Sequence, residues 1–281
     1  MMKQGFIFLF ADTNPRLVAD LARDAEVSGW DGFFVWKPIW GTDAWVALAV
    51  AAMQTERIRL GTMLSSLPRM RPWKLASEAA SLDNPSGGRL ILSVGLGALD
   101  TGYPEFGEIA DRRTRAELLD EGLAILTGLW AGQPFAHDGK HYTIKPSDLI
   151  TPPPPVQQLR IPIWMPGVWP REKSMARALR FDGLLPHVMD GEGKLQEVTP
   201  DAVRQMRARA NEVRGNDALF DIVVEGRTDP ASTEDGARLA EWEAAGAFWW
   251  IEEMGRDTPG SDAASLRAVA DRIAAGLSHA T

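Results

Sequence analysis

Short apolar runs alternate with longer amphipathic segments along the chain. Between the runs, apolar residues recur every three or four positions, which is the spacing of one face of a helix. A nearly continuous apolar run, such as residues 90–94, is typical of a strand covered on both faces. The runs lie at residues 5–10, 31–36, 57–63, 90–94, 161–165, 182–186, 218–225 and 247–252. The pattern therefore predicts eight buried strands, each followed by a helix.

Capping residues, Pro and Gly mark the ends of the predicted helices. Pro72 opens one of them, and the Pro- and Gly-containing stretch 84–88 ends it. Residues 57–97 thus form a complete strand–helix–strand unit, and both of its strands run into small residues that allow close approach to the backbone. The predicted helices lie at residues 14–28, 43–54, 72–83, 111–130, 170–180, 200–214, 233–245 and 261–277.

Residues 132–160 interrupt this alternation. They contain turn signals at Gly132-Gln133-Pro134 and Asp138-Gly139, and then four consecutive prolines at 152–155. We predict an inserted β-hairpin followed by a proline-stiffened segment. His137 and His141 have a spacing that would suit a metal on a helix, but they flank the Asp138-Gly139 turn. We therefore expect no metal site there.

Eight strand–helix units in series predict an α/β fold, a single (β/α)8 TIM barrel over residues 1–281 with the hairpin between units 4 and 5. A doubly wound open sheet is the alternative, although such sheets rarely contain eight strictly alternating units. In a (β/α)8 barrel the active site lies over the C-terminal ends of the strands. The strand ends that follow from the pattern are therefore the places to look for chemistry.

Composition narrows the function classes. The chain has 281 residues, 45% of them hydrophobic and 24% charged, with a net charge of −8. This charge argues against general nucleic-acid binding, and no apolar run is long enough to span a membrane. The chain has no cysteine, which excludes disulfides and thiolate chemistry and is compatible with the cytoplasm, where we expect the protein to act. The apolar run near the N-terminus is short, so we interpret it as a strand and not a signal peptide.

Few strand-end residues have side chains suited to catalysis. Lys37 could be a desolvated amine, a clamp for an anion, or simply solvated, and His187 could contact a ligand or be structural. Glu252 and Glu253 are adjacent on a strand, so at most one of them points inward. The chain has 11 tryptophans, and five suggest an aromatic pocket: Trp36, Trp40, Trp164, Trp169 and Trp250.

Several ordered motifs carry a resemblance to a known family. They are GWDGFFVW, TERIRLGT, LPRMRPWKLASEAASLDNPSGGRL, LSVGLG, LLDEGLAILTGLWAG, PIWMPG and RALRFDG. In this order and spacing, the chain resembles the luciferase-like flavin-dependent oxidoreductases of the bacterial luciferase superfamily over nearly its whole length. The resemblance implies a (β/α)8 barrel with an insertion, and a reduced FMN or deazaflavin F420 at its mouth.

The resemblance also implies where the cofactor would bind. Thr62, Ser65 and Ser66 match a segment that lies against the flavin ring in the family, often through a non-proline cis peptide. Gly95 and Gly97 match the segment beside the ring, and the family often has Asp-His where this chain has Trp36-Lys37. The family's phosphate-binding turn corresponds to Gly167, Val168 and Trp169, with Arg171 adding charge.

The turn itself gives a mixed signal. A Gly-containing turn before a helix N-terminus offers free N–H groups to a phosphate. Pro170 has no N–H, however, and Glu172 places a carboxylate beside the expected phosphate. A plain helix start is the alternative.

Three functions compete. The leading hypothesis is a monooxygenase that uses reduced FMN and O2 on a small organic substrate, with an F420-dependent oxidoreductase as its variant. The second is a non-catalytic flavin-binding barrel, and the third is an isomerase or aldolase with Lys37 as a Schiff-base amine. The leading hypothesis implies a flavin reductase as a partner and a homodimer, with no nucleic-acid or membrane partner.

Overall fold

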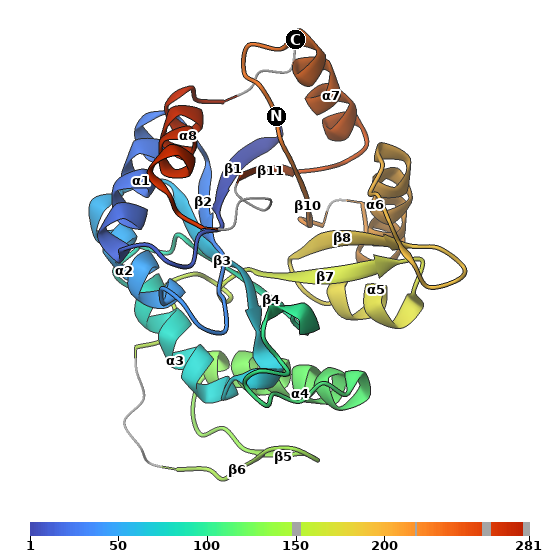
Figure 1. Cartoon of the computed structure of the whole chain (residues 1–281). Coiled ribbons are helices and arrows are strands. Elements are labelled where there is room, and N and C mark those ends of the chain that lie inside the picture. Colours follow the sequence, from blue (N-terminus) through green and yellow to red (C-terminus); the bar gives the residue numbers. More distant parts are fainter. Residues whose placement is uncertain (148–152, 217, 255–259, 278–281) are drawn as a thin grey trace.

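Eight parallel strands form a closed ring (Figure 1). The computed structural model describes residues 1–147, 153–216, 218–254 and 260–277. β11 pairs with β1, and β10 pairs with β8, which closes the ring. The strands of the ring are β1 (Lys3–Phe8), β2 (Gly32–Val35), β3 (Arg59–Ser66), β4 (Leu90–Gly95), β7 (Ile163–Trp169), β8 (Gly183–Met189), β10 (Asp221–Gly226) and β11 (Trp249–Met254). The predicted (β/α)8 barrel is confirmed, and the open sheet is excluded.

Helices cover the outside of the ring, one after each strand (Figure 1). Their starts follow the capping residues, since Asn14 accepts a hydrogen bond from Arg16 N and Asp43 accepts from Trp45 N and Val46 N. The helices are α1 (Pro15–Val27), α2 (Ala44–Gln54), α3 (Pro72–Asp83), α4 (Arg112–Ala131), α5 (Glu172–Ala178), α6 (Pro200–Arg214), α7 (Thr233–Ala244) and α8 (Ala263–Ala274). No helix in the described ranges is long and apolar enough to cross a membrane.

Large side chains fill the inside of the ring. Trp164 lies between Phe34 and Trp249, with ring centroids 5.3 and 5.4 Å apart. These side chains are fully buried, so the barrel interior is a packed core and not a channel. The remaining members of this inner core are Ile7, Met63, Ile91, Leu185, Val223 and Ile251. Any ligand must therefore bind above it, at the mouth.

Two strands extend further than the apolar runs indicate. β3 continues to Ser66 past the expected break at residue 64, and its Met63–Leu64 peptide is cis. β7 continues through Pro166 to Trp169, where a turn was expected. Pro166 is tolerated because β4 pairs with β7 only at Ile163 and Trp164, so Pro166 has a strand neighbour on one side alone.

The predicted hairpin insertion is present but small. β5 (His137–Asp138) and β6 (Thr143–Ile144) form an antiparallel pair after α4. The hairpin lies against α4, where Glu121 accepts hydrogen bonds from the backbone N–H groups of Lys140, His141 and Tyr142. Residues 148–152, including the first proline of the expected stiff segment, lie outside the described residues. A further short strand, β9 (Leu195–Gln196), pairs antiparallel with the end of β8.

Candidate active site

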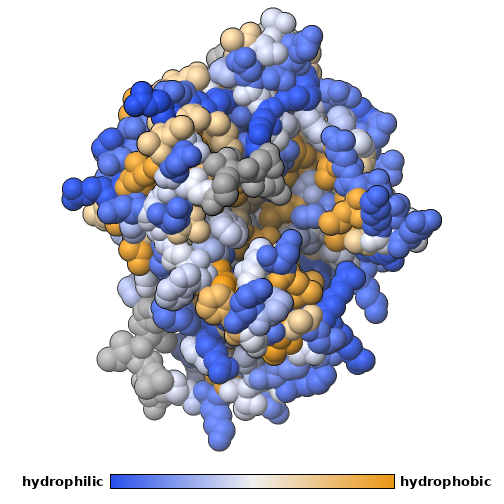
Figure 2. All heavy atoms as spheres, in the orientation of Figure 1, coloured by the Kyte–Doolittle hydropathy of each residue, from blue (hydrophilic) through white to orange (hydrophobic). Residues whose placement is uncertain are grey.

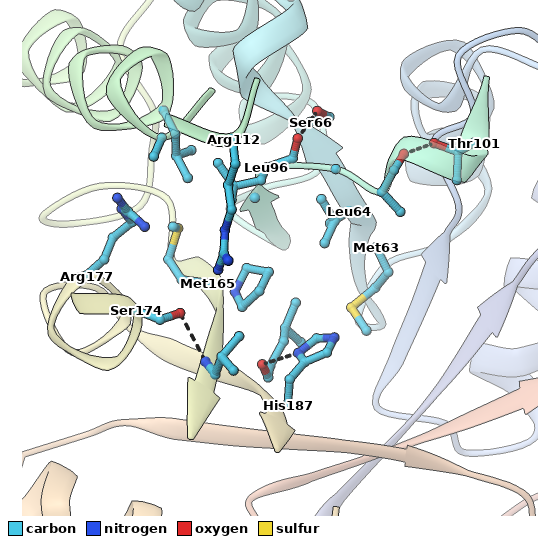
Figure 3. Close-up of a pocket in the computed structure, with 18 of the residues that line it drawn as sticks. Met63, Leu64, Ser66, Leu96, Thr101, Arg112, Met165, Ser174, Arg177 and His187 are labelled. Carbon is cyan, nitrogen blue, oxygen red and sulfur yellow. Dashed lines mark hydrogen bonds between the residues drawn. The ribbon is translucent and has the colours of Figure 1, made fainter. Parts of the chain in front are cut away.

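A cavity of about 1540 Å³ lies over the C-terminal ends of the barrel strands (Figure 3). The ends of β3, β4, β7 and β8 contribute to it, together with the first turns of α4 and α5. In the space-filling view a hollow opens near the middle of this face, with apolar surface at its bottom (Figure 2). The cavity is therefore where a (β/α)8 barrel is expected to hold its active site.

Apolar side chains form the inner wall. They are Ile7, Leu9, Met63, Leu64, Met165, Pro166 and Leu185. The buried Ser93 hydroxyl oxygen lies 3.5 Å from the Met63 sulfur and donates to it, which helps to fix the Met63 side chain. A wall of this kind suits one face of a large planar ring, because it excludes water without competing for polar contacts.

Gly95 lies in this wall for a packing reason. A Cβ at Gly95 would lie 2.9 Å from Pro166 Cγ and 3.2 Å from Leu64 Cδ1. The expectation was that small residues leave the backbone open to a ligand. The structure instead shows that protein side chains occupy the space beside Gly95.

A buried polar network holds the segment after β4. The hydroxyls of Ser66 and Tyr103 contact each other, and both also reach the carbonyl oxygen of Leu96, at 2.9 and 2.8 Å. Two hydroxyl protons must serve these three contacts, so the network has two proton arrangements. Arg115 Nη1 donates to the carbonyl of Gly97 at 3.0 Å. The backbone at residues 96–97 is thereby fixed along one side of the cavity.

The cavity lining is positively charged although the protein is acidic. Seven lining residues are Lys or Arg and four are Asp or Glu, in a chain of net charge −8. Five cations lie towards α4 and α5, and we call them the rim cations: Arg112, Arg113, Arg171, Lys173 and Arg177. Arg177 is paired with Asp120 at 2.6 Å and Arg113 with Glu117 at 3.1 Å. Among the described residues, the other three rim cations, Arg112, Arg171 and Lys173, have no ion-pair partner.

Two further cations follow β2 and β3, and we call them the inner pair: Lys37 and Arg69. Lys37 follows β2, and Arg69 ends the short 3₁₀ turn Leu67–Arg69 after β3. Burial lowers the pKa of the half-buried Lys37 amine, and the neighbouring charge of Arg69 acts in the same direction. Keeping Lys37 charged therefore lowers the stability of the folded protein.

The structure places eight of the twelve predicted site residues in the cavity lining. They are Trp36, Lys37, Ser66, Gly95, Gly97, Val168, Arg171 and His187. Thr62 and Ser65 are not in the lining, because their buried hydroxyls lie 2.9 Å apart and bond to each other. A Cβ at Gly167 would meet Leu184, and the Trp169 indole bonds to Gln205, so these two residues also lie elsewhere.

The phosphate-binding turn expected at residues 167–169 is not a turn. These residues belong to β7, and the Val168 N–H donates to the Ser174 hydroxyl at 3.0 Å. Because this N–H is already bonded, an anion here must be bound mainly by side chains. Ser174 and Arg177 lie on this side of the cavity in Figure 3.

The aromatic pocket suggested by the sequence is wrong for four of its five members. Trp36 lines the cavity, whereas Trp164 fills the barrel interior and Trp250 is buried in the outer core. Trp40 is 81% exposed and stacks on Phe106. The sequence shows which tryptophans follow strands but not the face to which each one turns.

The carboxylate pair considered at β11 is not in the cavity either. Glu252 is buried and accepts hydrogen bonds from the Thr228 N–H at 2.9 Å and from Arg272 Nε at 3.2 Å. It therefore has a structural role. His187 lines the cavity with an exposed ring, and its Nδ1 lies 3.2 Å from the Leu185 carbonyl oxygen.

Sequence reasoning missed most of the cations of the cavity. Arg112 points into it in Figure 3 and Arg177 lines it from α5, but both lie on helices and not at the strand ends. The charge run at residues 111–115 was the available signal, and Arg113 from that run does line the cavity.

The sequence profile of the luciferase-like monooxygenase family matches residues 3–264. The chain belongs to this family. The flavin-dependent oxidoreductase class expected from the motifs is thereby confirmed, and the family includes both FMN and F420 enzymes.

Curated relatives of this luciferase-like protein include both monooxygenases and F420-dependent enzymes. It is 38% identical over 121 residues to 4-hydroxyprotoasukamycin monooxygenase of Streptomyces nodosus subsp. asukaensis, covering 38% of this chain and 33% of the relative. It is 26% identical over 288 residues to the F420-dependent glucose-6-phosphate dehydrogenase of Beutenbergia cavernae, covering 90% and 84%. For three curated relatives the chain spans only 33%, 51% and 35% of the relative's length.

Solved structures agree on the fold. The F420-dependent tetrahydromethanopterin reductase of Methanopyrus kandleri superposes with a TM-score of 0.72 at 16% identity, covering 98% of both chains. The monooxygenase RslO1 of Streptomyces bottropensis gives 0.66 at 22% identity, covering 97% of this chain and 82% of that one. At these identities the likeness establishes the barrel and nothing finer.

The luciferase-like cavity fits an anionic flavin. Its volume exceeds the roughly 300–1000 Å³ of common ligand pockets, and its wall offers a flat apolar surface beside a positively charged rim. Arg112 and Lys173 in particular are cations without an ion-pair partner in the described ranges. A ligand with a planar ring and acidic groups would complement both features.

Proposed function

We propose that this protein is an oxidoreductase that uses the deazaflavin F420 for hydride transfer to or from a small organic substrate. The rim cations carry the proposal. Five cations gather on α4 and at α5, and the three without an ion pair, Arg112, Arg171 and Lys173, suit the extended acidic tail of F420. The match over most of its length to an F420-dependent dehydrogenase supports the same choice.

The rim cations revise the expectation drawn from net charge. The acidic composition favours FMN only if the charge is spread evenly over the surface. The cavity is the positive exception, because it has seven cations against four carboxylates while the chain as a whole has a charge of −8. The acidic tail interacts mainly with charges within about 10 Å, because salt screens the charges that lie further away.

Each part of the cavity has a proposed task. The rim cations would bind the acidic groups of the cofactor, and Met63, Leu64 and Pro166 would cover the ring and exclude water. Ser66 would orient polar edges of the ring through its hydroxyl. When bound, the deazaflavin supplies hydride chemistry, which no side chain of this cavity can supply. Lys37 and His187 are the candidate catalytic residues, because both side chains line the cavity.

An FMN-dependent monooxygenase is the second candidate. The observation in its favour is the 38% identity to a monooxygenase over 121 residues. Some relatives are named as the oxygenase component or oxygenating constituent of a monooxygenase, so this candidate would need a flavin reductase as partner.

We also propose that the protein is a homodimer through α2. The helix sequence AWVALAVAAMQ contains no charged residue, and a helix that is apolar on all sides is normally buried. Val46 and Met53 are nevertheless 53% and 74% exposed on its outer face. A second copy is the partner that would cover this face in a helix-to-helix contact.

Titration with both cofactors tests the function. We expect F420 to bind more tightly than FMN, with an affinity that falls more steeply between 50 and 500 mM NaCl because more charges are neutralised. The double variant R112Q/R171Q should lose at least tenfold in F420 affinity, and less for FMN. Arg267 is exposed and outside the cavity lining, so R267Q is the matched control. Tight FMN binding without F420 binding supports the second candidate, and binding of neither refutes both.

A further inference from the structure

The inner pair has a fixed arrangement at one side of the cavity. Arg69 Nη2 lies 3.3 Å from the Pro38 carbonyl oxygen and 3.5 Å from that of Lys37. The guanidinium is therefore held against the backbone that carries Lys37. Both side chains are half-buried and both line the cavity, so two positive charges converge on the same space.

Among the described residues, no carboxylate forms an ion pair with Lys37 or Arg69, although the charges of Asp43 and Glu78 act on Lys37 from further away. Lys37 has no ion pair or side-chain hydrogen bond there, and Arg69 Nε is buried without an acceptor. These two carboxylates have their bonding partners elsewhere, although Glu78 Oε2 has none among the described residues. Asp43 caps α2 through the N–H groups of its first turn, and Glu78 pairs with Lys74 at 2.6 Å.

Two adjacent cations that are partly buried and lack a counter-ion destabilise a fold, because each has lost hydration and repels the other. Such an arrangement is retained where a ligand supplies the missing negative charge. In the ring, β2 is three strand positions from β7, which leads into α5, so Lys37 lies across the mouth from the cations of α5. Arg112 and Arg113 lie nearer the pair, because α4 packs against the Leu67–Arg69 turn.

We propose that Lys37 and Arg69 bind an anionic group of the substrate, a carboxylate or a phosphate. The inference rests on the proposed function, since it assumes that the cofactor occupies the rim. Arg69 provides the forked donor that matches a carboxylate or phosphate, and Lys37 provides a point charge beside it.

Matched probes separate charge from shape. The cofactor-loaded protein is titrated with phenylacetate against phenylacetamide, and with phenyl phosphate against phenol, by calorimetry. We expect at least one charged probe to bind ten or more times as tightly as its neutral partner. This preference should fall to twofold or less in K37M and in R69M, and to an intermediate value in R69K, which keeps the charge but loses the fork.

Arg71 provides the control. It lies two residues from Arg69, is exposed, and stacks on Trp73 outside the cavity lining, so R71M makes the same chemical change without touching the site. R71M should keep the wild-type preference. Equal binding of charged and neutral probes by the wild type overturns the proposal, and so does a preference that survives in K37M and R69M.

Cofactor titrations of the same variants distinguish the two proposals. If K37M and R69M bind the cofactor like the wild type while losing the anion preference, both proposals stand. If they lose the cofactor as well, the inner pair serves the cofactor and the substrate assignment is wrong. If the wild type binds neither F420 nor FMN, the proposed function fails, and the anion preference is then measured on the protein alone.

Discussion

Lys37 is the residue at which function and stability conflict most clearly. Its half-buried amine has no partner among the described residues and lies beside Arg69, a like charge. We expect Lys37→Met to raise the free energy of unfolding of the cofactor-free protein by about 0.5–1 kcal/mol, because the methionine removes an unpaired charge and keeps the packing. Denaturant unfolding measures this change.

The neighbouring Lys74 should behave in the opposite way. It is exposed and pairs with Glu78, so Lys74→Met should cost about 0.3–0.5 kcal/mol.

The gain in stability from Lys37→Met should shrink as the pH approaches 10.5. The reason is that the lowered pKa lets the folded protein lose this proton before the unfolded chain does. Asp43, Arg69, Lys74 and Glu78 are the charges that act on this equilibrium. A loss of stability in K37M would show that the amine has a favourable partner.

Gly97 tests the packing along the cavity wall. Its φ is +79°, and a Cβ would lie 2.3 Å from the Tyr103 hydroxyl and 2.5 Å from the Ser66 hydroxyl. We expect Gly97→Ala to cost about 2–5 kcal/mol, from the left-handed backbone together with the clash. Gly107 has a similar φ of +65° with nothing within 4 Å, so Gly107→Ala should cost about 1–2 kcal/mol. Thermal unfolding measures the loss of stability in each variant, and the difference between the two losses is the cost of the clash. Equal losses would show that the clash contributes nothing.

For single residues, the sequence predicted which positions lie near the barrel mouth better than it predicted the direction of their side chains. Ser66, Gly95 and Lys37 were found because parallel strands end at one side of the sheet, and any residue that follows such a strand is near the mouth. The direction of a side chain depends on which face of the strand it occupies and on what packs there. Thr62, Ser65 and the tryptophans were misjudged for this reason.

At the scale of elements, charged and polar side chains link the β5–β6 hairpin to α4. Glu117 accepts from Lys140 Nζ at 2.7 Å and lies 3.0 Å from His141 Nε2, and these contacts lower the pKa of Glu117 to about 2. The stabilisation is therefore present above pH 4.5, the ordinary value, and is lost as the pH falls towards 2.

We expect Glu117→Gln to be less stable than the wild type above pH 4.5, and the difference to close as the pH falls to 2. Urea unfolding at several pH values measures it. Glu105 is exposed and has no hydrogen bond or ion pair in the described ranges, so Glu105→Gln should show no such trend. A constant difference for Glu117→Gln across this range would mean that the glutamate acts through packing alone.

Elements were the easiest feature to predict, because each repeats one pattern over many residues. All eight barrel strands and all eight helices were expected, and caps such as Asn14 fixed several helix starts. The errors fall where pairing overrides local signals. Pro166 was interpreted as a strand end, but β8 pairs with it, so the strand continues to Trp169.

For the whole molecule, the proposed dimer gives a direct test. Val46→Lys with Met53→Lys places two charges on the outer face of α2 and should yield monomers, whereas the wild type should elute as a dimer in size-exclusion chromatography with light scattering. Leu219 is 91% exposed and outside α2, so Leu219→Lys should leave the dimer intact. A monomeric wild type would refute the interface.

Whole-molecule features were predicted unevenly. The closed ring followed from counting units, because eight parallel units in series leave few other solutions. The positive cavity could not be predicted, since it gathers Lys37, Arg69, Arg112 and Arg177 from segments that are distant in the sequence. Composition reports only the average of such a charge distribution.

The ring is not equally strong all the way round. β7 and β8 pair with each other along their length, but β7 is joined to β4 only at Leu92–Ile163 and Ser93–Trp164. β8 is joined to β10 only at Gly183–Asp221 and Leu184–Ile222. Their amide hydrogens at these two joints should therefore exchange with solvent sooner than those of β1 and β2. Arg171, Lys173 and Arg177 belong to this panel, so the proposed cofactor would contact the part of the barrel that has the fewest backbone pairings to its neighbouring strands.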